Sequence, residues 1–465
     1  MSGFMWGSAT AAYQCEGAWN EGDKGMSNWD VFCHSEKNNV NPVTGDVSCD
    51  HYHRFEEDLD MMAAGNQNAY RFSIAWTRII PNGVGEVSEQ GVAYYNRVID
   101  ACLERGIEPL VTLYHYDMPN VLFEQGGWEN RANAEAFVEY AKVCFERFGD
   151  RVKWWATINE PTYDTLCCYA NGNYPPNVQD LERKWRAMYH QLLGSALAVR
   201  AYREGGYSGK IGLVSDSYSI ETLIDNAEYR EAARRADLFY NRSVNDVCIL
   251  GEVPQDFVEL LREEGYDLSY ALPGDEEMFR EGTVDYLGVN AYMRTLVKPA
   301  GPGETMFHAS NTGKKDDKVI TRVKGWFELD SDGSVPKNDW DMELYPKSIY
   351  NLLLELHRLY PNTPFVITEN GIGYYDTFED GKVHDPYRVE FLAGFVEWMQ
   401  RAQKEGVDVR GYFVWSTMDL YSWINGYKKR YGLVYVDYDD DNRRYPKDSY
   451  YWYRDMIAQQ NQKEE

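Results

Sequence analysis

Two short motifs in the sequence each place a glutamate beside an asparagine, directly after an apolar run. One is "TINEP", with Asn159 and Glu160, and the other is "VITENG", with Glu369 and Asn370. Two carboxyl groups that meet over one carbon can cleave an acetal, because one protonates the leaving oxygen while the other attacks or positions water. A single glutamate at a strand end is most often part of a rim ion pair. Two such pairs in mirrored order instead favour a glycoside-cleaving site.

The apolar runs before both motifs belong to a set of eight candidate strands. Several of these runs lack alternation of apolar and polar residues, which is typical of strands buried on both faces. Amphipathic segments separate them, such as residues 49–66, with Asp50 as a helix N-cap and Gly65 as a stop, and Asn133–Phe148, which Gly149 closes. The candidate strands are Phe4–Ala9, Ala69–Ile74, Pro109–Tyr114, Trp154–Ile158, Ile211–Val214, Tyr286–Asn290, Phe365–Thr368 and Gly411–Trp415.

Eight strand–helix units in one chain predict an α/β fold, a (β/α)8 TIM barrel with long βα loops. Residues 298–338, after the sixth strand, and residues 161–184, after the fourth, have little periodicity. We expect both to be long connections on the functional rim of the barrel. No repeat or linker divides the chain, so we expect residues 1–465 to form a single catalytic domain.

In such a barrel, the side chains at the C-terminal ends of the strands face the reaction site. We expect the fourth and seventh strands to face one another, so that Glu160 and Glu369 meet over the middle. Retaining glycosidases hold their two carboxyl groups about 5–5.5 Å apart. The other strand ends add polar and aromatic side chains: Gln14, Arg71, His115, Asn290, Tyr292 and Trp415.

Five motifs carry a resemblance to a known family. "TINEP", "VITENG", "TLYHYDMP", "ATAAYQCEGA" and "YRFSIAWTRI" resemble the signatures of family 1 glycoside hydrolases, and the resemblance runs from Phe4 to about Met456. It implies that Glu160 is the general acid/base and Glu369 the nucleophile of a retaining reaction, and that Arg71 and Tyr292 flank the nucleophile. The glycone contacts that it implies are Gln14, His115, Asn159, Asn290, Trp415 and Trp423.

These implied roles require different pKa values for the two glutamates. A nearby guanidinium lowers the pKa of a carboxyl group and keeps Glu369 ionised for attack. Glu160 must instead carry a proton at neutral pH, so burial and the charge of Glu369 should raise its pKa. Tyr116 stands where many relatives have tryptophan, and we assign it no function from the sequence.

The stretch "VWSTMDLYSWINGYKKRYGL" bears on the substrate. Family members acting on neutral sugars usually have glutamate in place of Ser422 and phenylalanine in place of Tyr431, and the pattern Ser422, Lys429, Tyr431 resembles the 6-phosphoglycosidase branch. A carboxylate 4 Å from one phosphate charge costs about 4 kcal/mol at an effective dielectric of 20, so serine removes a repulsion. Lys429 would supply the cation and Tyr431 a hydroxyl donor. The alternative is that Ser422 is an ordinary rim residue and "KKR" a solvated turn.

The sequence therefore predicts a retaining β-glycosidase that hydrolyses 6-phospho-β-glycosides. By resemblance, members that prefer galactosides or accept both sugars keep a tryptophan at the position of Trp423, as neutral-sugar members also usually do. The resemblance thus implies 6-phospho-β-galactosides, with 6-phospho-β-glucosides as further substrates. The alternatives are a β-glucosidase or β-galactosidase for unphosphorylated sugars, and a barrel that binds sugar without cleaving it. Trp340 is expected to wall the leaving-group side, or else to be a packing residue.

Composition narrows the range of partners. The net charge of −27 disfavours nucleic acid and anionic membranes as partners. The sequence has no apolar run long enough to span a bilayer and no secretion signal, and its eight scattered cysteines fit a cytoplasmic location. His51 and His53 lie two residues apart without a third ligand nearby, so we expect no metal and no other cofactor. The expected partner is a phosphorylated disaccharide substrate, and the oligomeric state stays open.

Overall fold

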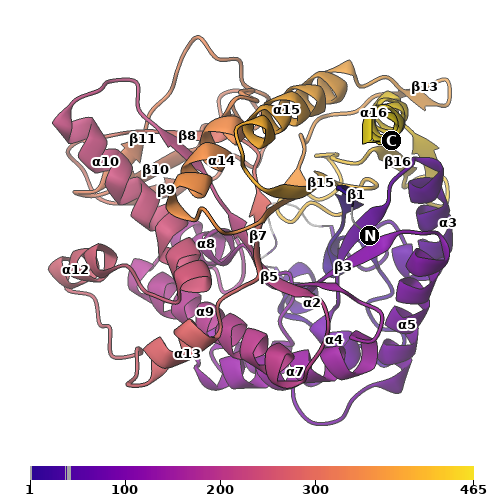
Figure 1. Cartoon of the computed structure of the whole chain (residues 1–465), viewed down its shortest axis with the longest axis horizontal. Coiled ribbons are helices and arrows are strands. Elements are labelled where there is room, and N and C mark those ends of the chain that lie inside the picture. The colour runs from indigo at the N-terminus through magenta and orange to yellow at the C-terminus, as the bar shows by residue number, and fades with distance from the viewer. Residues whose placement is uncertain (1–2, 37, 39–42, 465) are drawn as a thin grey trace.

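The computed structural model describes residues 3–36, 38 and 43–464. Eight parallel strands close into a barrel in the ring order β1-β15-β12-β7-β5-β4-β3-β2, and helices surround it (Figure 1). The predicted (β/α)8 TIM barrel and its eight strands are confirmed, with strand ends that shift by one or two residues. The barrel strands are β1 (Met5–Ala9), β2 (Ala69–Ser73), β3 (Glu108–Tyr114), β4 (Trp154–Asn159), β5 (Lys210–Asp216), β7 (Tyr286–Asn290), β12 (Phe365–Asn370) and β15 (Val409–Trp415).

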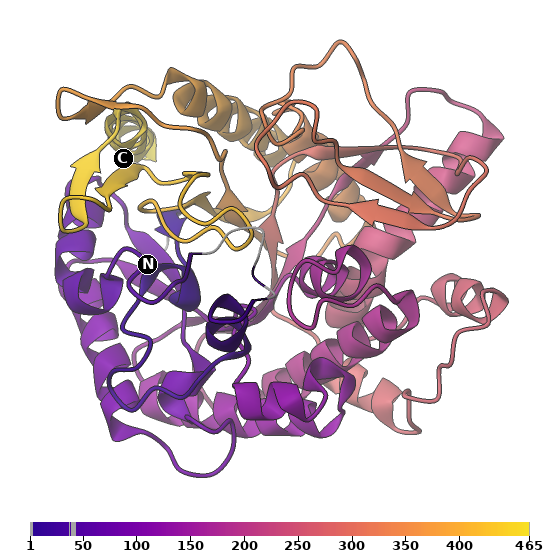
Figure 2. The same ribbon diagram turned by 180° about the vertical axis from the view of Figure 1, so that it is seen from behind.

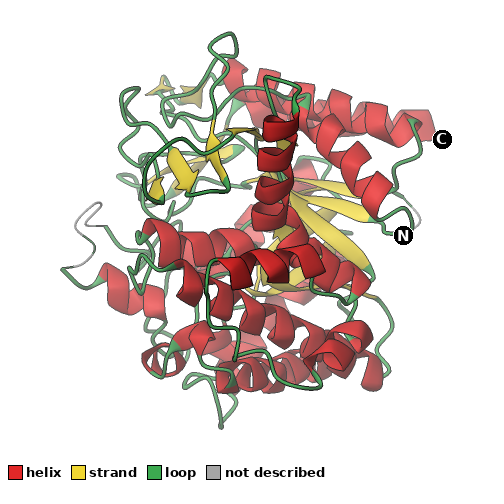
Figure 3. Cartoon of the chain, turned by 90° about the vertical axis from the view of Figure 1, so that its left-hand side faces the viewer, coloured by secondary structure: helices red, strands yellow, loops and turns green. Residues whose placement is uncertain are grey.

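The barrel strands are buried because helices cover their outer face. Every residue of β2 and of β7 is buried, which explains apolar runs without alternation. Figure 3 shows the strands enclosed by helices and the chain ends together on one side. The main outer helices are α3 (His51–Ala64), α5 (Glu89–Glu104), α7 (Ala132–Phe148), α9 (Leu181–Glu204), α10 (Ala227–Asp237), α14 (Ser348–Leu359), α15 (Pro386–Lys404) and α16 (Asp448–Glu464).

The start of α3 differs in one respect from the prediction. Asp50 precedes the helix and Gly65 ends it, as expected, but the Asp50 side chain caps no backbone N–H. Asp50 has a left-handed backbone, with φ 56° and ψ 33°, whereas a capping side chain belongs to an extended residue. Its carboxylate instead pairs with His53 Nδ1 at 2.6 Å and with Arg54 Nε at 3.3 Å.

The two connections expected to be irregular are partly ordered. The segment after β4 is helical, with α8 (Pro161–Leu166) and the short π-helix η2 (Cys167–Asn171), and α9 already begins at Leu181. The prediction of a long loop over 161–184 was therefore wrong for most of that segment. Pro161 at the first helical position starts α8 without a periodic apolar pattern, which is why the sequence did not indicate it.

Residues 298–338 contribute three short strands to a second, small sheet. Its order is β6-β8-β11-β10-β9, formed by β6 (Ser219–Glu221), β8 (Arg294–Lys298), β9 (Met306–His308), β10 (Ile320–Val323) and β11 (Phe327–Leu329). Strands of three to five residues are too short for a periodic signal. In Figure 2 this sheet and the segment after β15 lie on the same face of the molecule, which is the predicted functional rim.

The two glutamate-bearing strands are not diametrically opposed as expected. In the ring, β4 and β12 are three positions apart, and β5 and β7 lie between them on the shorter side. Register shifts occur between Ala156 and Asn159 in β4 and between Ile367 and Glu369 in β12. Such irregularities re-aim side chains next to functional sites. Glu160 itself adopts a left-handed backbone with φ 48°, which turns the chain into α8.

Candidate active site

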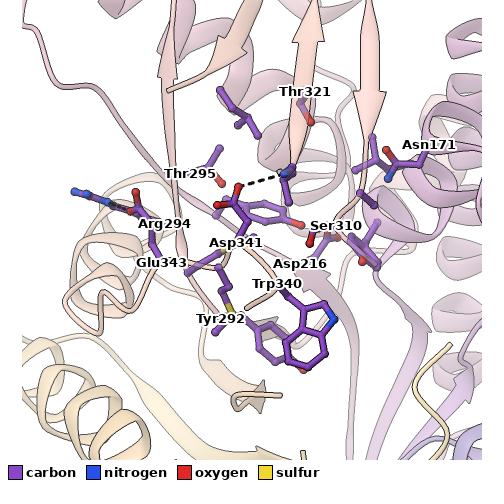
Figure 4. Close-up of a pocket in the computed structure, with 18 of the residues that line it drawn as sticks. Asn171, Asp216, Tyr292, Arg294, Thr295, Ser310, Thr321, Trp340, Asp341 and Glu343 are labelled. Carbon is purple, nitrogen blue, oxygen red and sulfur yellow. Dashed lines mark hydrogen bonds and ion pairs between the residues drawn. The ribbon is translucent and has the colours of Figure 1, made fainter. Parts of the chain in front are cut away.

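A cavity of about 860 Å³ opens at the C-terminal ends of the barrel strands. It extends from the two glutamates to the small sheet, whose side of the cavity is drawn in Figure 4. Arg71 and Asn159 are fully buried and are not part of the lining. The other predicted site residues line it: Gln14, His115, Glu160, Asn290, Tyr292, Trp340, Glu369, Trp415, Ser422, Trp423, Lys429 and Tyr431.

Both oxygens of Glu369 are held by donors from other strands. Arg71 Nη1 donates to Glu369 Oε1 at 2.6 Å, and Tyr292 Oη donates to Glu369 Oε2 at 2.6 Å. Burial raises the pKa of Glu369, while the Arg71 charge and the hydrogen bonds from Tyr292 and Arg71 act in the opposite direction. The guanidinium therefore stabilises the ionised form and fixes the orientation of the carboxylate.

Glu160 is held by weaker, uncharged donors. Asn290 Nδ2 donates to Glu160 Oε1 at 2.7 Å, and the Tyr116 hydroxyl donates to Oε2. Burial, followed by the charge of Glu369, raises the pKa of Glu160 to about 7. Among the described residues no cation pairs directly with Glu160, so we expect this carboxyl group, rather than Glu369, to be the one that carries a proton near neutral pH.

Asn290 connects the two carboxyl groups. Besides its contact with Glu160, a hydrogen bond from Asn290 lowers the pKa of Glu369. Asn290 comes from β7, between the two glutamate-bearing strands, and Thr368 Oγ1 donates to Asn290 Oδ1 at 2.7 Å. Both glutamates thus converge on one amide group, as attack on an anomeric carbon and protonation of the leaving oxygen bonded to it require.

A second polar layer lies beneath this pair. Asn159 Oδ1 accepts from Arg71 Nη2 at 2.7 Å and from Asn290 Nδ2 at 3.1 Å, and Asn159 Nδ2 lies 3.2 Å from His115 Nε2. Since Asn159 Nδ2 is a donor, His115 Nε2 accepts and the imidazole proton resides on Nδ1. Burial and the Arg71 charge lower the pKa of His115, which keeps the ring neutral. The predicted contact of Asn159 with a glycone stays a prediction, since its side chain lies below the lining.

Two polar atoms on this side of the cavity have no partner in the described chain. They are Gln14 Oε1, whose amide nitrogen donates to Tyr421 O at 2.7 Å, and His115 Nδ1. One is an acceptor and the other a donor. A buried polar group without a partner costs about 1–3 kcal/mol, so the pair is suited to a hydroxylated ligand.

Three further polar groups meet near the segment after β15. Within the described residues, Ser422 Oγ, Lys429 Nζ and Tyr431 Oη form no hydrogen bond or ion pair. The Lys429 ammonium lies 4.9 Å from the ring centroid of Trp340 and 5.4 Å from that of Tyr431, and burial lowers its pKa to about 7. A Cβ on Gly373 would approach Lys429 Cε to 2.6 Å, so this corner is tightly packed.

The neighbouring cation has a different role. Arg430 Nη1 pairs with Asp419 at 2.7 Å, and Asp419 also accepts from Lys447 Nζ at 2.7 Å. Lys447 also pairs with Asp376, and the side chains of Lys447, Asp376 and Asp419 are fully buried. This network anchors the segment that carries Lys429. Of the three basic residues in "KKR", Lys428 is exposed, Arg430 belongs to the network, and Lys429 lines the cavity.

Replacing Lys447 by methionine should lower the free energy of unfolding by about 3–5 kcal/mol, because two carboxylates would stay buried without their cation. Chemical denaturation monitored by tryptophan fluorescence measures this change. Exposed Lys142, whose ion pair with Glu139 lies at the surface, is the matched control, and Lys142→Met should change stability by less than about 1 kcal/mol. Equal effects of the two substitutions would contradict the anchoring role.

Tyr116 is a site residue that the sequence did not reveal. It is buried with φ 76°, two residues after the end of β3, and its hydroxyl donates to the carboxyl group of Glu160. This hydrogen bond lowers the pKa of Glu160. Its position beside His115 at a strand end was the available signal.

Tyr116→Phe should therefore raise the pKa of Glu160 and move the alkaline limb of kcat/KM to higher pH. The sign follows because the lost donor stabilised the ionised carboxylate more than the protonated acid. A pH–rate profile between pH 5 and 9 measures the limb, with Tyr114→Phe on the same strand as a control. A limb that stays in place or moves to lower pH would contradict the assigned contact.

No metal site emerges from the described chain. Within residues 3–36, 38 and 43–464, no group of three or more His, Cys, Asp or Glu is placed to hold an ion. His51 Nδ1 instead pairs with Asp58 at 2.8 Å, and His53 pairs with Asp50 and Glu21. The cysteines are free and buried. Of the helices that the structure describes, none has the length and apolarity needed to cross a membrane.

Comparison with known proteins decides the family. Residues 1–462 match the model of Glycosyl hydrolase family 1. The chain belongs to this family. It is a retaining glycosidase, and the predicted resemblance is confirmed.

Similar relatives differ in the substrates that their names state. A 6-phospho-beta-galactosidase of Clostridium acetobutylicum is 40% identical over 97% of this chain and 95% of its own, and the Aryl-phospho-beta-D-glucosidase BglC of Bacillus subtilis is 39% identical over 98% and 96%. Beta-glucosidase A of Thermotoga maritima is 38% identical over 98% and 97%. A solved beta-glucosidase from Thermotoga maritima in complex with glucoimidazole superposes with a TM-score of 0.88 at 37% identity, covering 98% of both chains.

Trp340 is a packed residue that also lines the cavity, and its expected place on the leaving-group side stays a prediction. It is 4% exposed, and its Nε1 donates to Asn425 Oδ1 at 2.8 Å, so it is well packed. It also lines the cavity of this family 1 enzyme, next to Lys429. Its position beside Lys429 links the wall of the cavity to the three unpartnered polar groups.

Proposed function

We propose that this enzyme hydrolyses 6-phospho-β-glycosides by double displacement, with 6-phospho-β-galactosides preferred. In the first step, Glu369 attacks the anomeric carbon and the protonated Glu160 gives its proton to the leaving oxygen. In the second step, Glu160 takes a proton from water, which attacks the same carbon and releases Glu369. The net result is hydrolysis with retained configuration, carried out by one catalytic domain over residues 1–465.

The electrostatics of the pair support this division of roles. The charge of Glu369 helps to hold the proton on Glu160 before the first step. Once the sugar is bonded to Glu369, that charge is gone, so the pKa of Glu160 falls and Glu160 can act as a base. Arg71 and Tyr292 hold Glu369 in place, while Gln14, His115, Asn290 and Trp415 would contact the glycone.

The phosphate proposal rests on three polar groups that have no partner among the described residues: the Ser422 hydroxyl, the Lys429 ammonium and the Tyr431 hydroxyl. An ammonium and two hydroxyls without protein partners can accept a phosphate through charge-assisted hydrogen bonds. Burial lowers the pKa of Lys429 to about 7, and a bound phosphate would favour the charged form of this lysine. The similar relatives include enzymes named for both phosphorylated and unphosphorylated sugars, so these three residues carry the choice.

Two finer features complete the proposal. Trp423 stacks on Tyr13, with ring centroids 5.9 Å apart and planes 7° apart, and lines the cavity where a galactose ring could lie against it. A sugar phosphate does not cross a bilayer unaided, which favours a cytoplasmic enzyme.

The direct test compares 4-nitrophenyl β-galactoside with and without a 6-phosphate. We expect kcat/KM to be at least about 100-fold higher for the phosphorylated compound, since each charge-assisted hydrogen bond contributes about 1.5–3 kcal/mol. The same comparison with the glucosides measures the galacto preference. A preference for the unphosphorylated galactoside would refute the phosphate proposal and leave the family assignment intact.

A further inference from the structure

The cavity continues past Glu160 toward the small sheet, and this part holds unexplained polar groups. Asp216 is 4% exposed, and both of its carboxyl oxygens lack a partner in the described chain. Ser310 Oγ, from the segment between β9 and β10, is buried without a partner as well. Both residues line the cavity, and Figure 4 draws them with Thr295 and Thr321 on this wall. The glycone and phosphate contacts proposed above use none of these four side chains.

The place of Asp216 in the barrel puts it beside the acid/base. Asp216 is the last residue of β5, pairs in register with Asn290, and follows Val214, whose carbonyl accepts from the Glu160 N–H at 2.8 Å. In the ring, β12 and β7 separate β5 from β15, the strand that leads to Ser422 and Lys429. Asp216 therefore lies at a strand end three positions away from the one that leads to these two residues.

This position corresponds to the leaving-group side of the reaction. The acid/base must contact the oxygen that joins the two halves of the substrate, so the departing half occupies the side of Glu160 that is remote from the glycone. With the 6-phosphate held near Lys429, the departing half extends toward β5 and the small sheet. Asp216 and Ser310 are the unpartnered polar groups in its path.

A buried lysine interacts electrostatically with Asp216. Lys184 of α9 is fully buried, which lowers its pKa to about 7, and its Nζ lies 3.7 Å from the centroid of the Trp185 ring and 3.8 Å from Met188 Sδ, with no carboxylate of the described residues in ion-pair distance. Asp216 is the acid whose charge acts on Lys184. Burial and the charge of Glu160 raise the pKa of Asp216, while its own backbone N–H, the Tyr218 hydroxyl and the charge of Lys184 act in the opposite direction. Among the described residues, neither carboxyl oxygen has a hydrogen-bond partner.

We propose that Asp216, assisted by Ser310, is a specificity-determining site that binds the hydroxyl groups of a sugar leaving group. A second sugar can donate hydroxyl hydrogens to the Asp216 oxygens and exchange a hydrogen bond with Ser310. A simple aryl leaving group has no such donors and leaves the buried carboxyl group unpaired. The enzyme is then a disaccharide hydrolase rather than an aryl-glycosidase, an inference that rests on the proposed assignment of Glu160 as acid/base.

The test measures two substrates that share one glycone: a β-1,4-linked disaccharide phosphorylated at C6 of its non-reducing galactose, and 4-nitrophenyl 6-phospho-β-galactoside. The readout is the ratio of their kcat/KM values. Asp216→Leu, of similar shape but without acceptors, should lower this ratio by about 10–100-fold, the effect of losing two hydrogen bonds of about 0.5–1.5 kcal/mol each. Asp216→Asn, which keeps one acceptor oxygen, should lower it less, and Ser310→Ala should lower it about fivefold.

An unchanged ratio in Asp216→Leu would overturn the proposal. So would an equal loss for both substrates together with a shifted pH profile, because that result makes Asp216 a positioning residue for Glu160. Both substrates carry the same phosphate, so its contribution cancels in the ratio of kcat/KM values. If the phosphate proposal fails and the wild-type enzyme prefers unphosphorylated sugars, the same ratio is measured with the unphosphorylated disaccharide and aryl galactoside. The two proposals can therefore fail independently.

Discussion

Replacing Glu369 by glycine should lower kcat for β-glycosides by at least about 10⁴-fold, a loss comparable with that caused by removing the nucleophile of other enzymes that act through covalent intermediates. The reason is geometric, since Glu369 Oε1 and Oε2 are fixed by Arg71 and Tyr292. A water molecule in the vacated space would be neutral and would lack this fixed orientation toward the anomeric carbon. Steady-state release of nitrophenol measures the effect.

A small anion should restore part of this loss. Azide or formate can occupy the space left by the Glu369 carboxylate, beside the Arg71 guanidinium, and attack the anomeric carbon as Glu160 protonates the leaving oxygen. One displacement then replaces two, so the glycosyl azide formed must have the inverted, α configuration. A β product would contradict the role of Glu369, as would more than about 1% residual activity without added anion.

Glu160→Gln provides the matched comparison. It removes the proton donor but leaves the nucleophile, so its effect should depend on the leaving group. Nitrophenolate departs readily without protonation, whereas a sugar alkoxide does not. The loss in kcat should therefore be larger for a disaccharide than for an aryl glycoside. Thermal unfolding of both variants shows whether the fold is intact.

Much of the fold could be predicted because the barrel strands are buried on both faces. Runs such as "PLVTLY" are almost entirely apolar, which indicates strands buried on both faces. Gly65 and Gly149 mark the ends of two of the helices between the strands. The small sheet could not be predicted in the same way. Its strands are three to five residues long, and the sheet joins β8 both to β11 and to β6, which is distant in sequence.

The site was predictable where a residue directly ends a recognisable strand. Glu160, Glu369, Asn290 and His115 meet this condition, and the structure brings them to one cavity. Asp216 did not meet it, because the apolar run of the fifth strand ends at Val214 while β5 continues for two polar residues. Pairing with β7 through Asn290, rather than hydrophobicity, extends the strand and places Asp216 at the rim.

Tyr116 was missed for another reason. Its side chain acts through a contact with Glu160 that connects β3 to β4, and a sequence displays no such cross-strand contact. The rise in the pKa of Glu160 was predicted in the right direction. The expected lowering of the pKa of Glu369 was wrong, because burial raises this pKa more than the Arg71 charge lowers it. The difference between them comes from Arg71, which binds Glu369 directly.

The decisive change for substrate choice is Ser422→Glu. It should lower kcat/KM for 6-phospho-β-galactosides by at least about 10³-fold. A carboxylate 4 Å from a single phosphate charge costs about 4 kcal/mol at an effective dielectric of 20, and the phosphate carries about 1.5–2 charges at pH 7. The new carboxylate would also pair with Lys429, which has no ionic partner among the described residues, and so withdraw the cation from the ligand. The loss should appear mainly in KM, since the phosphate is remote from the anomeric carbon.

Ser422→Gln separates charge from size, because glutamine has the shape of glutamate without its charge. We expect it to lower kcat/KM for the phosphorylated substrate by about tenfold, through crowding and loss of one hydroxyl donor. For the unphosphorylated galactoside, Ser422→Glu should be at least as active as Ser422→Gln, because a carboxylate accepts charge-assisted hydrogen bonds from sugar hydroxyls. Equal losses in the two variants would mean that space rather than charge excludes the substrate, and Lys429 would then lose its assigned role. A large difference confined to the phosphorylated substrate would instead place the phosphate within a few ångströms of position 422, where Lys429 and Tyr431 can contact it together.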